Sequence, residues 1–403
     1  MRVLFIHPAY PSQFTAIAHA MAGVPGVETA FLTDVGFGDQ IRNDNVPIPY
    51  FGYTKDPSPG ESVWYTTSYD EGIRHGKGVC DVLPDIMTSF PADVVVGHAS
   101  FGATFFLKNM FRIPVISYVE LPGYHMAWCR SEYPPLAEHL FMNSAFQSLV
   151  YTSAVNSDRV IVPSRHAADH FPVELQPKIR VQMEGFKLPE LCTDKRAIRM
   201  KFDLPADGPI IGFASRTLEA MRGFDIFLNL VKQLKTIRSD LHVLVVGSEQ
   251  TMYGNELTYL GGKSFKQQVM EDLNMGDGDF ISRDYLAYDA FHEHLQAMDL
   301  IVFPLFEGAA NWGLFEAMAS GVPVIASNRC FIPEVISHGE DGFMFDPYAL
   351  EDMVNQSLAI LDNPVAYSAV GINARNKIRD YYSVENSVKG YLDVIAEVIG
   401  QNL

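Results

Sequence analysis

The sequence predicts an α/β protein built from two doubly wound domains in tandem. Short apolar runs, rich in β-branched residues and nearly uninterrupted, alternate with segments of helical period along most of the 403 residues. This pattern is typical of parallel strands that helices cover on both faces. The alternation breaks once and then resumes, and a chain of this length with 48% hydrophobic residues is too large for one compact core. We therefore expect two domains.

The N-terminal domain is expected to span residues 1–185. Its predicted strands share an apolar, β-branched composition; they are RVLFIH, VETAFL, DVVVGH, PVISYV, RVIVP and IRVQME. Two insertions, residues 47–67 and 120–135, are rich in aromatic residues, proline and glycine. Loops of that length are often functional or lid-like, and packed surface loops are an equally good interpretation.

Residues 186–206 carry charges, proline and glycine without a sustained apolar run, which predicts a linker. The C-terminal domain is expected to span residues 207–380. Its predicted strands are PIIGFA, LHVLVVG, DFISR, LIVFP and VPVIAS. Residues 381–403 contain an amphipathic helix that must bury its apolar face, and we expect it to pack back toward the N-terminal domain.

Composition excludes several classes of protein. A formal charge of −18 and a pI near 5.0 argue against a nucleic-acid-binding surface and against charge-driven binding to anionic lipid, although a peripheral membrane contact stays open. The four cysteines are dispersed without a C-x-x-C, which argues against zinc and against a disulfide scaffold. The N-terminus begins directly with a strand, and no apolar segment approaches about 18 residues. We expect a soluble, cytoplasmic protein; the oligomeric state is open.

Ligands of open α/β sheets bind beyond the carboxyl ends of the strands, so residues at these ends are the first candidates. The N-terminal domain offers Ser12, Gln13, His98 and Glu120 there. A lone histidine at a strand end is more often structural than catalytic, but glycines flank His98 and allow backbone to approach a ligand closely. Two further aromatic residues, Tyr124 and Trp128, could stack on a sugar, cover a lipid chain or belong to a packed loop.

The C-terminal domain offers Ser215, Gly247 and Arg283 at strand ends, together with a pair of arginines. Arg216 and Arg222 bracket the entry to a helix. Two guanidinium groups beside a helix N-terminus can bind a diphosphate, because they present fixed forks to its oxygens while the helix presents backbone N–H groups and the positive end of its dipole.

The segment FEGAANWGLFEAMASG, residues 306–321, is the second anion-binding candidate. Its small residues, Gly308 and Gly313 among them, let backbone amides approach an anion ahead of a helix. Glu316 lies early in that helix, where an acid is favourable in any case, and it could also accept hydrogen bonds from a sugar or ribose diol. No G-x-G-x-x-G follows the first strand and no G-x-x-x-x-G-K-[ST] occurs, which disfavours an NAD enzyme and a P-loop ATPase.

Together these motifs resemble a known family. The order R…RGFD, VVG, P-x2-E-G, G-x2-E-A-M-A-S-G-x-P-V-I-A-S, P-E-V-I and G-E-D-G is similar to the donor domain of glycosyltransferase family 4, retaining enzymes of the GT-B fold. The segments LFIHPAYPSQFTAIAHAMA, DPSPG, VVVGHASFGATFFLKN and VPSRHAADHFP resemble a bacterial branch whose members begin with an HQNFPGQF-like segment. The resemblance covers essentially the whole chain and implies two Rossmann-like domains that face each other across a cleft.

The resemblance also implies a reaction. A nucleotide-diphosphate sugar would bind mainly to the C-terminal domain and an acceptor mainly to the N-terminal one, with retained anomeric configuration and with neither a metal nor a cofactor. Arg216 and Arg222 match the basic pair that neutralises the donor diphosphate, and His98 matches a histidine near the reaction centre. Ser12 and Gln13 match the loop beneath the donor phosphates, and Glu316 matches the second Glu of the E-x7-E motif.

The first Glu of that motif departs from the family pattern. Counting back from Glu316, its position falls on Gly308, and Glu307 makes the spacing E-x8-E. The bacterial branch often carries an apolar turn with a tryptophan here, which Trp312 resembles. Glu307 either fills the role through a one-residue bulge or only faces solvent.

Breaking the sugar–phosphate bond develops negative charge on the leaving diphosphate. Preorganised donors are worth about 2.7 to 4 kcal/mol each. Besides the two arginines, the donors expected here are the amides of Asn311, Trp312, Gly313 and Leu314. Because a double displacement needs a well-placed carboxylate, our hypothesis is front-face attack with the leaving phosphate as base. The alternatives are a nucleotide-sugar epimerase of the same fold and a non-catalytic sugar-nucleotide-binding or partner subunit. The donor base and sugar, the acceptor and the linkage stay open.

Overall fold

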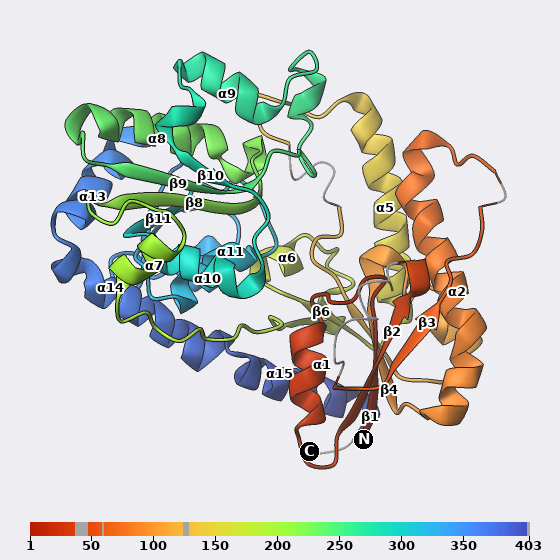
Figure 1. Ribbon diagram of the computed structural model, residues 1–403. Helices are drawn as coiled ribbons and strands as arrows, with labels where there is room; N and C mark the ends of the chain where they lie inside the picture. The colour runs from red at the N-terminus through yellow and green to blue at the C-terminus, as the bar shows by residue number, and fades with distance from the viewer. Residues whose placement is uncertain (37–46, 59, 124–128, 401–403) are drawn as a thin grey trace. The chain divides into compact units, whose positions relative to one another are not determined.

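The computed structural model describes residues 1–36, 47–58, 60–123 and 129–400 (Figure 1). The chain forms two compact units. Unit 1 contains Met1–Met126, Leu136–Gly185 and Tyr382–Leu403, and unit 2 contains Ala127–Pro135 and Phe186–Tyr381. The segment of unit 1 that ends at Gly185 ends where the expected N-terminal domain does. Residues 129–135, however, belong to unit 2 and not to the N-terminal domain, in which we expected them.

Unit 1 is built on a seven-stranded parallel sheet of order β3-β2-β1-β4-β5-β6-β7. Its strands are β1 (Arg2–Ile6), β2 (Glu28–Asp34), β3 (Tyr50–Tyr53), β4 (Val94–His98), β5 (Val115–Tyr118), β6 (Arg159–Val162) and β7 (Ile179–Val181). Its helices are α1 (Thr15–Ala22), η2 (Trp64–Thr66), α2 (Thr67–Ser89), η3 (Ala99–Phe101), α3 (Leu107–Met110), α5 (Ala137–Asn156), α6 (Arg165–Asp169), η4 (Gln176–Lys178) and α15 (Val384–Ile399).

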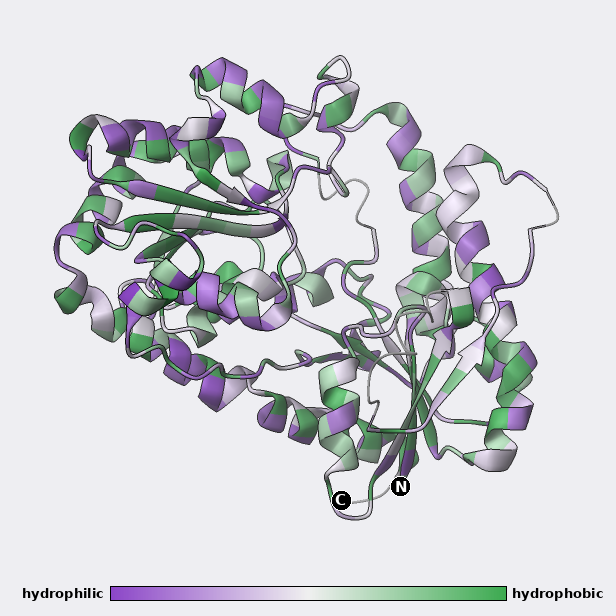
Figure 2. Ribbon diagram, viewed as in Figure 1, coloured by the Kyte–Doolittle hydropathy of each residue, from purple (hydrophilic) through white to green (hydrophobic). Residues whose placement is uncertain are grey.

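Both faces of this sheet are buried, as the uninterrupted apolar runs require. In β1, Val3 and Phe5 point into one core cluster, and Leu4 and Ile6 point into another. Helices α1 and α15 close the first cluster, whereas α2 and α3 close the second. The C-terminal helix α15 therefore belongs to unit 1, where its apolar face completes the core. Figure 2 shows the apolar strands of both sheets flanked by helices with one polar side.

Unit 2 has a six-stranded parallel sheet of order β10-β9-β8-β11-β12-β13. Its strands are β8 (Ile210–Thr217), β9 (His242–Ser248), β10 (Ile281–Arg283), β11 (Leu300–Phe303), β12 (Val324–Ser327) and β13 (Phe343–Phe345). Its helices are α7 (Lys195–Lys201), η5 (Ala220–Arg222), α8 (Phe224–Ile237), η6 (Glu256–Thr258), α9 (Phe265–Leu273), η7 (Asp277–Asp279), α10 (Tyr288–Ala297), α11 (Trp312–Ala319), α12 (Ile332–Val335), α13 (Leu350–Asp362) and α14 (Pro364–Lys377), with the π-helical turn η8 (Ile378–Tyr382) at the unit boundary.

The segment 186–206 is part of unit 2, so the prediction of a linker is wrong. Asp194 caps helix α7 by accepting from the amide of Ala197 at 3.0 Å. On the same helix the buried Arg199 donates to the carbonyl of Ala297 at 2.9 Å and to the carboxylate of Asp299 at 2.6 Å. The charged residues that suggested a linker therefore cap the helix of this segment and join it to the connection between α10 and β11.

Among the described residues, none of the helices combines the length and the apolar character needed to cross a membrane.

Candidate functional site

The carboxyl end of β8 carries the first of the two predicted arginines. Arg216 is exposed, and its Nη1 donates a hydrogen bond to the hydroxyl of Tyr253 at 3.2 Å. Beside it, the buried hydroxyl oxygen of Ser215 has no partner in the described part of the chain. A buried polar atom of this kind generally awaits water or a ligand.

Arg222 converges on the same tyrosine from the short helix η5. Its guanidinium carbon lies 5.4 Å from the ring centroid of Tyr253, and its side chain is only 14% exposed. Its nearest carboxylate, Glu219, lies 3.9 Å from its Nε, and that Nε has no hydrogen-bond partner among the described residues. A buried guanidinium with unsatisfied donors is suited to bind an anion.

Glu219 holds the loop after β9 against η5. Its buried carboxylate accepts hydrogen bonds from the hydroxyl of Thr217 and from the amides of Met252 and Tyr253, both at 3.0 Å. The carboxylate is therefore largely satisfied without Arg222, and it fixes the backbone of the tyrosine that both arginines touch.

Gly223 explains how η5 meets the segment after β11. Its φ of 74° lies in the left-handed region, and a Cβ there would collide with the carbonyl oxygen of Pro304. Two residues on, the amide of Phe306 donates to the carbonyl of Met221 at 2.9 Å. The arginine-bearing turn and the segment that begins at Phe306 consequently lie side by side, as the diphosphate hypothesis requires.

The turn at 307–313 offers fewer amides than the sequence predicted. Asn311 is the N-cap of α11, and its Oδ1 accepts from the amide of Leu314 at 3.1 Å. Leu314, which we had expected to donate to a ligand, is buried and already engaged by the cap. In the described structure the amides of Trp312 and Gly313 have no acceptor, so they remain as donors at the helix N-terminus.

Glu307 folds back on its own turn, where its Oε1 accepts from the amide of Gly308 at 2.8 Å. A Cβ at Gly308 would meet no atom closer than 3.5 Å, so packing does not require glycine at this position.

Glu316 is 7% exposed, and burial raises the pKa of its carboxyl to about 7. No described residue donates a hydrogen bond to this carboxylate. The hydroxyl of Tyr288 on α10 has a raised pKa, mainly because it is buried and also because the negative charge of Glu316 is nearby. A largely buried acid with a raised pKa, on the helix that follows strand β11, is a functional candidate.

Two predicted donor-binding residues have structural roles. The guanidinium of Arg283 donates to the carbonyls of Ser282 at 3.1 Å and Phe202 at 3.0 Å. A Cβ at Gly247 would lie 2.6 Å from the carbonyl oxygen of Ser215, so this glycine allows β9 to approach β8 closely. A ligand contact by either residue stays a prediction.

In unit 1, two of the predicted residues come together: the amide nitrogen of Gln13 donates to the carboxylate of Glu120 at 3.1 Å. The amide of Ser12 donates to the hydroxyl of Thr15 at 2.8 Å, while the buried Ser12 hydroxyl has no partner among the described residues. Tyr124 and Trp128 lie outside the described residues.

His98 is fully buried, which the sequence did not indicate. Its ring packs against His7, Phe101 and Tyr118 at centroid distances of 5.3, 4.7 and 5.1 Å, and within the described residues neither ring nitrogen has a hydrogen-bond partner. Burial lowers its pKa well below the usual value, so the ring is neutral. Its catalytic role stays a prediction.

A buried acid of unit 1, Glu184, was not predicted from the sequence. Glu184 accepts a hydrogen bond from the hydroxyl of Tyr118 and is buried beside Tyr391, and burial raises its pKa to about 8. An acidic residue three positions after the end of β7 was the available signal. Arg130 and Glu219 also escaped notice, since their importance depends on contacts made across the fold.

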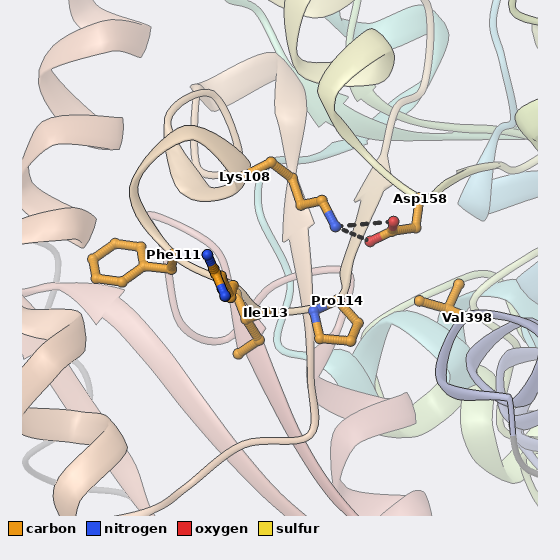
Figure 3. Close-up of a pocket in the computed structure, with 7 residues that line it drawn as sticks. Lys108, Phe111, Ile113, Pro114, Asp158 and Val398 are labelled. Atoms are coloured by element: carbon orange, nitrogen blue, oxygen red, sulfur yellow. Dashed lines mark hydrogen bonds and ion pairs between the residues drawn. The ribbon is translucent and has the colours of Figure 1, made fainter.

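A surface cavity of about 340 Å³ lies elsewhere in unit 1 (Figure 3). In the figure Lys108 and Asp158 face each other across it, joined by an ion pair of 2.9 Å. Pro114 and Asp158 directly precede β5 and β6, so this cavity opens at the amino ends of the strands, whereas ligands of such sheets bind at the carboxyl ends.

The class of the protein follows from two family models that match adjacent parts of the chain. The model described as glycosyl transferase family 4 group matches residues 26–191, and the model described as glycosyl transferases group 1 matches residues 194–377. The chain belongs to this family of glycosyltransferases, as the sequence analysis expected, and it is an enzyme of that class.

Individual relatives of this chain are also named as sugar transferases. The lipopolysaccharide 1,2-N-acetylglucosaminetransferase of Salmonella typhimurium is 23% identical over 89% of this chain and 86% of its own length. The sulfoquinovosyl transferase of Arabidopsis thaliana is 25% identical over 74% of this chain and 54% of its own length. Among solved structures, sucrose-phosphate synthase from Thermosynechococcus elongatus has a TM-score of 0.75 at 16% identity and 99% coverage of both chains. Anabaena HepE in complex with UDP-glucose has a TM-score of 0.71 at 15% identity, with 98% of this chain and 100% of that chain covered. The prediction of two Rossmann-like domains of the GT-B class is confirmed.

Proposed function

We propose that this glycosyltransferase binds a nucleotide-diphosphate sugar through unit 2 and transfers the sugar, with retention of its anomeric configuration, to a glycan, lipid-linked or small-molecule acceptor. The observation that carries the proposal is the convergence of Arg216 and Arg222 on Tyr253, next to the η5 turn that lies alongside Phe306. The Salmonella relative is named for transfer of N-acetylglucosamine, and HepE was solved with UDP-glucose, which makes a uridine diphosphate sugar the first donor to test.

In this proposal the arginines neutralise the charge that develops on the leaving diphosphate, with the amides of Trp312 and Gly313 as further donors. Because the two guanidinium groups would neutralise the negative charge of the diphosphate, the proposal requires no metal ion. Glu316 would accept hydrogen bonds from the donor ribose. Its burial is then understandable, since a carboxylate held without partners in the free protein can gain its hydrogen bonds from the substrate.

We further propose front-face transfer, in which the leaving phosphate takes the acceptor proton. The carboxylate of Glu307 accepts from the amide of its neighbour Gly308. This local contact favours a structural role for Glu307 over that of a nucleophile on the opposite face of the sugar.

The experiment measures nucleoside diphosphate released from a panel of uridine, guanosine, adenosine and thymidine diphosphate sugars, in EDTA and without acceptor. We expect slow hydrolysis of one donor and an initial sugar product of retained configuration by NMR. Arg222→Met should abolish this hydrolysis. Arg238→Met, at the opposite end of α8, is the control and should leave the hydrolysis unchanged. Binding without release would favour a non-catalytic subunit, and exchange of deuterium at sugar C2 would favour an epimerase.

A further inference from the structure

The segment 129–135 lies between two parts of the chain that belong to unit 1, yet it folds onto unit 2. Fifty residues, Leu136–Gly185, separate it in sequence from the rest of that unit, which begins at Phe186. Its contacts are made with the same segments that form the proposed diphosphate site, and Arg130 makes the central ones.

Arg130 connects three backbone segments through one buried guanidinium. Its Nη1 donates to the carboxylate of Asp225 at 2.7 Å and to the carbonyl of Ala220 at 3.0 Å. Its Nη2 donates to Glu132 at 2.6 Å, and its guanidinium carbon lies 4.0 Å from the ring centroid of Phe306. Only 3% of the side chain is exposed.

Three of these partners lie in segments that form the proposed diphosphate site. Ala220 begins the η5 turn that carries Arg222, Asp225 lies in the first turn of α8, and Phe306 directly precedes Glu307. Two carboxylates balance the charge of Arg130, so it is not itself a phosphate ligand. Its planar fork instead fixes the relative positions of η5, α8 and the turn after β11, which a lysine could not do.

The same segment also holds the loop that contains Tyr253. The carbonyl of Pro134 accepts hydrogen bonds from the side-chain amide of Asn255 and the hydroxyl of Tyr259, both at 2.6 Å. The ring of Tyr133 packs edge-on against Phe265 at 5.9 Å between centroids. Residues 129–135 therefore hold in place both the η5 turn that carries Arg222 and the loop that carries Tyr253.

We propose that Arg130 is a positioning residue for the diphosphate site. It holds Arg222 and the adjoining turn in the arrangement that binds the two phosphates together, and it thereby sets the preference for diphosphate over monophosphate. This inference rests on the proposed function, because it concerns affinity for the leaving group of the same reaction.

The test is a calorimetric titration of wild type and Arg130→Met with a uridine monophosphate and a uridine diphosphate, or with the base that the donor panel identifies. We expect Arg130→Met to lower diphosphate affinity at least tenfold and monophosphate affinity less than threefold. In steady-state assays the donor KM should rise in proportion while kcat changes less.

The matched control is Arg199→Met. Arg199 is an equally buried arginine of unit 2 that also pairs with a carboxylate and two carbonyls, but none of its partners lies in the site. It should lower the melting temperature as Arg130→Met does and leave the diphosphate preference unchanged. If Arg130→Met fails to fold, Asp225→Asn, which keeps an acceptor, should still reduce the preference at least threefold.

The outcomes separate the two ideas. If wild type binds no nucleoside diphosphate, the proposed function fails. If wild type binds it and Arg130→Met or Asp225→Asn keeps the full preference for diphosphate, the positioning role is overturned while the proposed function stands. An equal loss of preference in Arg199→Met would also overturn it, since the effect would then follow from general destabilisation.

Discussion

Replacing Glu316 by glutamine should stabilise the free protein at alkaline pH and weaken donor binding at the same time. Burial raises the pKa of this carboxyl from 4.5 to about 7. A raised pKa means that the folded state prefers the protonated acid. The cost of ionising it therefore appears as the pH rises above 4.5 and is complete above about 7.

The size of the effect follows from the shift. A difference of this order corresponds to about 3 kcal/mol between the two forms, taking about 1.4 kcal/mol for each tenfold change in proton affinity. For a unit of roughly 200 residues, about 1 kcal/mol moves the melting temperature by about 2–4 °C. At pH 8 the Glu316→Gln variant should therefore melt at least about 6 °C higher than wild type, and at pH 4.5 the two should nearly coincide.

Differential scanning calorimetry across pH 4.5–8.5 measures this difference directly. Glu184 has a raised pKa as well, but it is present in both proteins and cancels in the comparison. Glu340→Gln, at an exposed acid of the same unit, is the control and should show no pH-dependent gain. Donor affinity should fall about tenfold or more in Glu316→Gln, since hydrogen bonds to charged groups contribute about 1.5–3 kcal/mol. Equal melting temperatures of wild type and Glu316→Gln at pH 8 would refute the reasoning.

Four further substitutions test the packing and the site. Gly371→Ala should destabilise the protein by several kcal/mol, because its Cβ would collide with the backbone of Gly321, whereas Gly308→Ala should leave the melting temperature unchanged; thermal unfolding of both checks this, and equal effects would contradict it. Tyr253→Phe should leave stability unchanged and raise the donor KM several-fold, and an unchanged KM would remove Tyr253 from the site. His98→Phe should keep the fold, since neither ring nitrogen has a described partner, and should lower turnover; full activity would end its catalytic assignment.

The uninterrupted apolar runs predicted most of the fold, because a strand buried on both faces has a composition that few other segments share. Two edge strands were missed. Strand β3, YFGY, lies in an insertion flanked by prolines, and β13, FMF, has only three residues. Short edge strands depend on pairing with a neighbour that is distant in sequence, and their own residues carry little periodic signal.

Only part of the site could be predicted, because some of its residues are recognisable from the local sequence and others depend on contacts between distant segments. The arginine pair and Glu316 stand out because charged residues at strand ends and helix starts have few structural explanations. The contacts that position them cannot be seen in the local sequence. Arg130 contacts Asp225 at a sequence separation of 95, and Asn311 accepts from the amide of Leu314 only once the helix has formed. Burial of His98 likewise depends on rings from separate segments of the chain: His7 after β1, Phe101 in η3 and Tyr118 in β5.

The most direct test of the central claim compares a nucleoside monophosphate with the corresponding diphosphate by calorimetry in EDTA, in wild type and in Arg222→Met. Our account predicts that wild type binds the diphosphate at least tenfold more tightly and that Arg222→Met loses most of this difference, because the guanidinium is the buried donor that the second phosphate satisfies. Equal affinity of wild type for the two nucleotides, or no binding of either, would contradict the assignment of unit 2 as the donor-binding unit.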